Sequence, residues 1–213
     1  MKKKFMPHVA ILTAIMMSSS ILVISTAYAH EGRLYSIGGK DYWITVGSVN
    51  EPVYVDDKSG AEAFISTADP SDPLNSDANG TKNLEGLEKT IKFEVSAGDK
   101  KKELEVEPAW QDPGHYITTF YPTIETTYKY RLFGTINNVT VSLDYECTPG
   151  PHVENTQENS TKQISEGIVL KADRGSFGCP SSRTDAGFPE PYVSDNELAT
   201  MVKELQNSKN STK

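Results

Sequence analysis

The chain has 213 residues, 37% of them hydrophobic, and its 29 acidic and 21 basic residues give a formal net charge of −8. Residues 1–29 hold three lysines and no acid, so the remainder, with 18 basic against 29 acidic residues, carries −11. Such a polyanion repels phosphate backbones, which excludes nucleic-acid binding. The length suits one domain with an appendage, and ten tyrosines with seven phenylalanines can supply its core.

The N-terminus has the three parts of a secretory signal peptide. Three lysines at positions 2–4 precede an apolar run from Val9 to Ile24, and Ala27-Tyr28-Ala29 forms an Ala-x-Ala cleavage pattern. We expect residues 1–29 to be removed, with a cut after Ala27 as the second option. An uncleaved anchor is the alternative, because the run is nearly long enough to span a bilayer. Cleavage predicts a soluble protein in an extracellular or periplasm-like space.

Two further features agree with export. Cys147 and Cys179 are the only cysteines, and an even pair in an oxidising compartment predicts a disulfide. Four Asn-x-Ser/Thr sequons lie in polar segments where a glycan would be tolerated, although such sequons are frequent by chance. They are Asn79, Asn138, Asn159 and Asn210.

Short strands fill residues 30–147. Ile91, Phe93 and Val95, for example, alternate with charged residues, which places one face in a core and the other in water. Seven to nine such strands separated by turns predict an all-β, Ig-like antiparallel β-sandwich. The expected strands are 34–37, 42–46, 53–55, 63–66, 91–96, 103–107, 116–121, 128–133 and 139–145.

A long insertion, residues 69–83, interrupts this pattern with Pro, Asp, Asn and Ser. It is either a functional loop or a mobile surface excursion. Its aspartates lack the EF-hand spacing, so the sequence does not indicate a calcium site.

Residues 148–213 are expected to form an extension tethered by the disulfide. Residues 164–170 are a candidate edge strand, and Ser194-x-x-Glu197 is a capping box that predicts a helix over 195–206. Its apolar stripe is expected to pack against the domain or a partner. The stripe consists of Leu198, Met201, Val202 and Leu205.

Cleavage after Ala29 would make His30 the mature N-terminus. Its α-amine and near ring nitrogen would form a two-point chelate, and one more histidine would complete a three-nitrogen set suited to Cu(II). His115 is the best partner, because it opens a predicted strand, and Asp112 could be an axial ligand or orient its ring. His152 is a weaker candidate, and a plain turn histidine at 115 is the alternative.

Other catalytic motifs are missing from the sequence, which contains no Gly-x-Ser-x-Gly, His-Glu-x-x-His, Walker or Gly-x-Gly-x-x-Gly pattern. The two cysteines do not form a Cys-x-x-Cys redox pair. The residues therefore favour a non-enzymatic protein and leave an enzymatic role open.

Several short motifs, in order along residues 30–147, resemble exported β-sandwich proteins of the CopC/YtkA-like group, of the type found in archaea. They are Tyr42-Trp43-Ile44-Thr45-Val46-Gly47, Pro113-Gly114-His115-Tyr116 and Phe133-Gly134-Thr135-Ile136-Asn137. The resemblance implies an Ig-like sandwich and, as in copper-binding members, a site made by the mature N-terminal His30, by His115 and by Asp112. The group's Asp-x-His spacing appears here as Asp112-x-x-His115, which changes where the carboxylate points.

These observations predict an exported Cu(II)-binding protein for copper storage, delivery or sequestration. The alternative is a non-metal interaction or structural module of the cell envelope, in which sandwich edges, loops and the helix engage a protein partner. A copper oxidase or monooxygenase acting through the same terminal-histidine site is the third possibility.

Overall fold

The computed structural model of the chain describes residues 29–150, 157–159, 161–184 and 187–211. The predicted signal peptide, apart from Ala29, and His152 lie outside the described residues.

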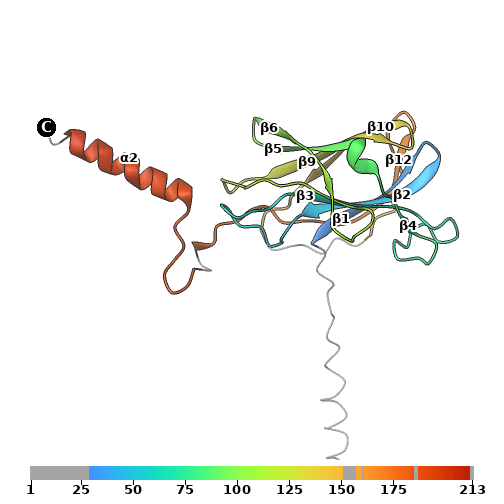
Figure 1. Cartoon of the computed structure of the whole chain (residues 1–213), viewed down its shortest axis with the longest axis horizontal. Helices are drawn as coiled ribbons and strands as arrows, with labels where there is room; N and C mark the ends of the chain where they lie inside the picture. Colours follow the sequence, from blue (N-terminus) through green and yellow to red (C-terminus); the bar gives the residue numbers. More distant parts are fainter. Residues whose placement is uncertain (1–28, 151–156, 160, 185–186, 212–213) are drawn as a thin grey trace, which may run out of the picture.

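Two antiparallel sheets pack face to face as a β-sandwich, with one helix at the C-terminal end (Figure 1). The larger sheet has the order β11-β12-β1-β2-β3-β8-β7, with β4 paired to β3, and the smaller sheet has the order β10-β9-β5-β6. This confirms the predicted fold class. The strands are β1 His30–Ile37, β2 Lys40–Ser48, β3 Ala61–Thr67, β4 Lys82–Asn83, β5 Ile91–Ala97, β6 Lys100–Leu104, β7 Glu107–Pro108, β8 His115–Ile117, β9 Tyr128–Ile136, β10 Val139–Glu146, β11 Lys162–Ser165 and β12 Ile168–Gly175.

The core lies between the sheets and follows from the alternation in the strands. Ile91, Phe93 and Val95 on β5 are buried, as predicted, and pair across the smaller sheet with β9. Each side chain of this size stabilises the fold by about 1.5–3 kcal/mol when fully buried. The inward face of β3 consists of Ala61, Ala63 and Ile65, so the residues between them point to the outer face of the larger sheet.

A second, smaller core covers part of that outer face and explains the 69–83 insertion. It is built around Trp43, whose indole Nε1 donates a hydrogen bond to the Pro73 carbonyl at 3.0 Å. The Arg174 guanidinium lies 4.6 Å from the centre of the Trp43 ring. Within the loop, Asp69 accepts a hydrogen bond from the Gly80 amide at 3.0 Å. The insertion therefore covers Trp43, where the sequence left its role open.

The sandwich continues beyond Cys147, where the sequence analysis placed its end. β12 lies inside the larger sheet, between β11 and β1, so the extension supplies two strands of this layer. The single edge strand expected at 164–170 is in fact a hairpin with Gly167 at its turn, where a φ of 75° suits glycine. The predicted disulfide joins Cys147 to Cys179, with their Cα atoms 4.9 Å apart.

Three predicted strands differ from those observed. The strand expected at 103–107 is divided, since β6 ends at Leu104 in the smaller sheet and β7 begins at Glu107 in the larger one. The other two are shorter than expected. Residues 53–55 make only an isolated bridge from Tyr54 to Ser181, because Asn50 and Asp56 on either side have positive φ angles that turn the chain. The strand expected at 116–121 ends at Ile117.

The helix α2, Asp195–Ser211, begins where the capping box predicts and runs five residues further. Glu197 accepts hydrogen bonds from the Ser194 amide at 2.8 Å and from its hydroxyl at 2.9 Å. The helix extends away from the sandwich (Figure 1), and its four stripe residues are 49–62% exposed, so the stripe does not pack against the domain. Within the described residues, no helix combines the length and apolar character needed to cross a membrane.

Candidate functional site

His30 and His115, far apart in the sequence, both lie on the outer face of the larger sheet. His30 is the first residue of β1 and pairs with Gly47 on β2, which in turn pairs with Glu62 on β3. His115 is the first residue of β8 and pairs with Phe64, two residues along β3 from Glu62. The sheet register therefore brings both imidazoles to the side chain of Glu62.

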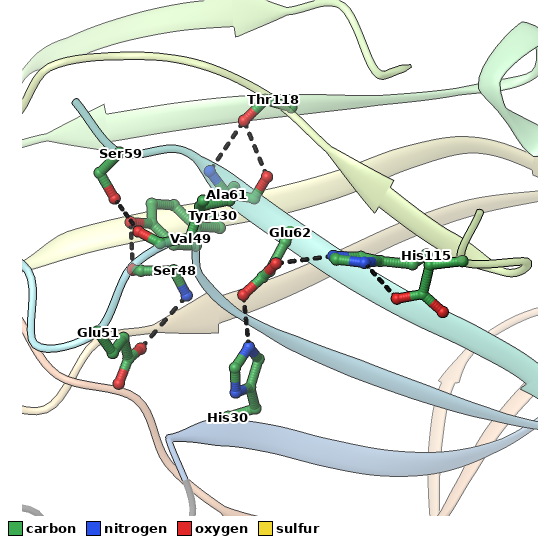
Figure 2. Close-up of polar contacts among 11 residues, drawn as sticks. His30, Ser48, Val49, Glu51, Ser59, Ala61, Glu62, His115, Thr118 and Tyr130 are labelled. Atoms are coloured by element: carbon green, nitrogen blue, oxygen red, sulfur yellow. Dashed lines mark hydrogen bonds and ion pairs between the residues drawn. The ribbon is translucent and has the colours of Figure 1, made fainter. Parts of the chain in front are cut away.

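The Glu62 carboxylate bridges the two histidines, and Figure 2 shows it between their rings. Its Oε1 is 2.8 Å from Nε2 of His30, and its Oε2 is 2.7 Å from Nε2 of His115. On the other edge of the His115 ring, Nδ1 lies 2.8 Å from Oδ2 of Asp112. A carboxylate oxygen accepts hydrogen bonds, so a ring nitrogen that carries a proton donates to the carboxylate it faces. We call these four residues the His30–Asp112 cluster.

Solvent exposure increases across the cluster, from Glu62 at its buried centre to Asp112 at its exposed end. The Glu62 side chain is only 10% exposed, whereas the Asp112 side chain is 52% exposed. Phe64 forms an aromatic wall, since its ring stacks on His115 at 4.0 Å between centroids and meets the edge of His30 at 5.7 Å. A buried carboxylate is costly unless it is paired, and the two histidines supply that pairing.

Two glutamates at this end of the sheet have opposite pKa shifts. Burial by itself would raise the pKa of Glu62, but the hydrogen bonds and charges of His30 and His115 outweigh it and hold that pKa below its usual value. Burial raises the pKa of Glu51 to about 7, although the Ser48 amide donates to its Oε1 at 3.3 Å. Glu62 is thus the anionic carboxylate that faces both histidines (Figure 2).

An open cavity of about 490 Å³ lies beside the exposed end of the cluster. Asp112 and His115 line it together with Glu85, Glu88 and Tyr116. Three carboxylates in one concave surface attract cations from solution, so this side of His115 is favourable for the approach of a metal ion.

As the side chains stand, the described residues contain no group of three or more His, Cys, Asp or Glu arranged to hold a metal ion. The Glu62 carboxylate lies between the two rings and contacts Nε2 of each. The donor types nevertheless fit a borderline divalent ion, since imidazole nitrogens and a carboxylate oxygen suit Cu(II). Nδ1 of His30 is turned away from Glu62 (Figure 2).

The structure brings together all three site residues predicted from the sequence and places a fourth, Glu62, between the two histidines, which the sequence analysis did not single out. His30 and His115 share Glu62, and Asp112 contacts His115 on its far side. Little in the sequence marked Glu62 as a site residue, because it stands just before the expected strand 63–66. Acidic residues are also common on the solvent faces of strands. The one indication was that small apolar residues, Ala61 and Ala63, both buried in the structure, flank this acid.

No protein-family model, curated protein or solved structure matches the chain.

Proposed function

We propose that this chain is an exported protein that binds Cu(II) through the His30–Asp112 cluster, for copper storage, delivery or sequestration. The observation that supports the proposal most directly is the carboxylate of Glu62 held between the imidazoles of His30 and His115, at 2.8 and 2.7 Å. Three strands contribute these residues, so the sheet itself sets their spacing.

Nitrogen donors favour Cu(II), which stands at the top of the affinity order for divalent ions of its row. Cleavage after Ala29 would add the α-amine of His30, which together with Nδ1 of the same residue makes a chelate. Asp112 would orient the His115 ring by holding Nδ1, as carboxylates commonly do for metal-binding histidines. The acidic cavity beside His115 would raise the local concentration of cations.

A Cu(II) titration followed by EPR tests this proposal. It uses protein whose mass verifies a His30 terminus, and as a matched control the same protein with Ala29 retained. We expect one-to-one binding with several nitrogen ligands, weakened at least about 10-fold in the control, because a peptide bond there removes the α-amine donor. Weak, carboxylate-like binding that is equal in the two proteins would refute the terminal-histidine site.

A copper oxidase or monooxygenase at the same site remains a less favoured alternative. Turnover of added reductant by the copper-loaded protein, abolished in His115→Ala, would support it.

The second candidate is an envelope interaction module, and the exposed stripe of α2 favours it. Leu198 and Leu205 are 49% and 62% exposed on a helix that extends away from the sandwich. Apolar residues spaced along one helix face are a common protein-recognition element. Envelope partners cross-linked to the wild-type chain and lost from Leu198→Glu/Leu205→Glu, with copper binding unchanged, would support this function.

A further inference from the structure

Another cavity of about 490 Å³ opens at the edge of the sandwich, between β6 and residues 119–123. Its apolar lining includes the buried side chains of Phe120 and Tyr128 and the ring of Tyr121, which is 58% exposed. We call this cavity the β6 pocket. None of the described residues that line it belongs to the His30–Asp112 cluster. A concave surface of this size with apolar and aromatic walls is typical of a site for a small organic molecule.

The register of the smaller sheet places two lysines on the pocket side of β6. Lys102 pairs with Val95 on β5, and Val95 is buried in the core. Lys100 pairs with Ala97, two residues further along the same face. Directly paired residues of an antiparallel sheet share a face, so both lysines lie on the inner face of the sandwich. They stay exposed because β6 is the edge strand, and they line the β6 pocket there.

The lysine between them is engaged elsewhere. Lys101 also borders the pocket, but its ammonium group donates to Oε1 of Glu94 on the outer face of the sheet, at 3.2 Å. Lys102 makes no ion pair with any of the residues that the structure describes. Lys100 pairs with Asp99 at 3.2 Å, and both side chains are 85% exposed, where such a pair is worth little.

The two inner lysines form a local positive site in an acidic protein. Residues 100–102 are the only three consecutive basic residues within 30–213. Lys100 and Lys102 stand two residues apart on one face of a strand, which separates their Cα atoms by about 7 Å. Like charges at this distance repel each other, and an anion held between them would relieve the repulsion.

The opposite wall of the pocket is already in place. Residues 119–123 are held at Phe120, which exchanges backbone hydrogen bonds with Ser59 at 2.8 and 2.9 Å. The Phe120 ring stacks on Tyr128, with 6.0 Å between centroids and 23° between planes. A ligand therefore meets a formed aromatic surface that ends in the exposed ring of Tyr121, and little ordering of the protein opposes binding.

We propose that the β6 pocket binds a small aromatic carboxylate. The aromatic ring of the ligand lies against Phe120, Tyr121 and Tyr128, since aromatic rings prefer offset or edge contacts with one another. Its carboxylate accepts charge-assisted hydrogen bonds from Lys100 and Lys102, which a neutral or cationic relative of the same shape cannot do. This site is separate from the proposed copper site, so either one can fail without the other.

The first test is an NMR titration of the signal-free protein, in metal-free buffer, with three probes that share one ring system. They are 2-naphthoate, the neutral 2-naphthylmethanol and the cationic 2-naphthylmethylamine. We expect 2-naphthoate to shift the amide signals of residues 95–97, 100–102 and 119–123 and to saturate. The alcohol should bind at least about 10-fold more weakly, because it lacks the charge-assisted hydrogen bonds, and the amine more weakly still.

The second test separates the charge from the ring by variants. Lys100→Gln/Lys102→Gln should weaken 2-naphthoate binding at least about 10-fold and leave the alcohol nearly unchanged. Lys101→Gln is the matched control, because its ammonium group serves the other face of the same strand. Tyr121→Ala should weaken the acid and the alcohol alike. Trp110→Ala, which removes an 88% exposed ring outside the pocket, should change neither.

Three results would overturn the proposal. They are 2-naphthoate shifts that do not saturate or are scattered over the surface, equal binding of the acid and the amine, and an equal loss of binding in Lys101→Gln. Lysines on an edge strand also oppose aggregation between sheets. If the double lysine variant aggregates and wild type binds no 2-naphthoate, these lysines protect the edge and the β6 pocket is not a carboxylate site.

Discussion

The raised pKa of Glu51 predicts a specific dependence of stability on pH. Its ionised form is disfavoured in the folded protein, where burial raises the pKa from 4.5 to about 7. A group of this kind contributes stability that is fully present below its unfolded pKa and is lost as the pH rises through its folded pKa. The loss is therefore expected between about pH 4.5 and pH 7.

The magnitude follows from the size of this shift. A pKa of about 7 instead of 4.5 corresponds to at most about 3 kcal/mol between the neutral and ionised forms. Glu51 is only partly buried, so screening by solvent leaves about 1–2 kcal/mol. Glu51→Gln keeps an oxygen that can accept from the Ser48 amide and cannot ionise.

Urea unfolding of wild type and Glu51→Gln at pH 5 and pH 8 measures this effect. We expect the wild-type free energy of unfolding to fall by about 1–2 kcal/mol more than that of Glu51→Gln over this range. Groups that do not interact with Glu51 contribute equally to both proteins, so the difference between the profiles isolates the Glu51 carboxyl. The lowered pKa of Glu62 concerns a more acidic range, because its contribution is lost only as the pH falls below 4.5. Parallel pH profiles for the two proteins would refute the reasoning.

Two further predictions concern stability. Replacing Cys147 and Cys179 by serine should lower the free energy of unfolding by about 3–4 kcal/mol, the chain-entropy value for a loop of this length, and a loss under about 1 kcal/mol in urea unfolding would contradict it. Gly134→Ala should destabilise by about 2–4 kcal/mol, because a Cβ there would lie 2.0 Å from the Thr90 carbonyl at a φ of 136°; a melting temperature equal to that of wild type would contradict this prediction.

Features encoded by neighbouring residues could be predicted from the sequence. Ile91, Phe93 and Val95 alternate with polar residues, and this period of two is set by the strand itself whatever the strand pairs with. The Ser194–Glu197 capping box marks the start of α2, because both partners lie within one helical turn. Export, the disulfide pair and the importance of His30 were inferred in the same local way, and cleavage at Ala29 remains a prediction.

Tertiary structure decided which of these segments are neighbours. β12 follows Cys147 in sequence yet pairs with β1, and no local pattern states that pairing. Glu62 becomes a functional candidate only because the register aligns His30, Gly47 and Glu62 across three strands. The sequence by itself predicted most of the strands, the start of the helix, the disulfide partners and the two histidines of the site, because those signals are periodic or compositional. Only the folded sheet decided that the Glu62 carboxylate lies between the two histidines, because strand order and register arise from the packing of the whole chain.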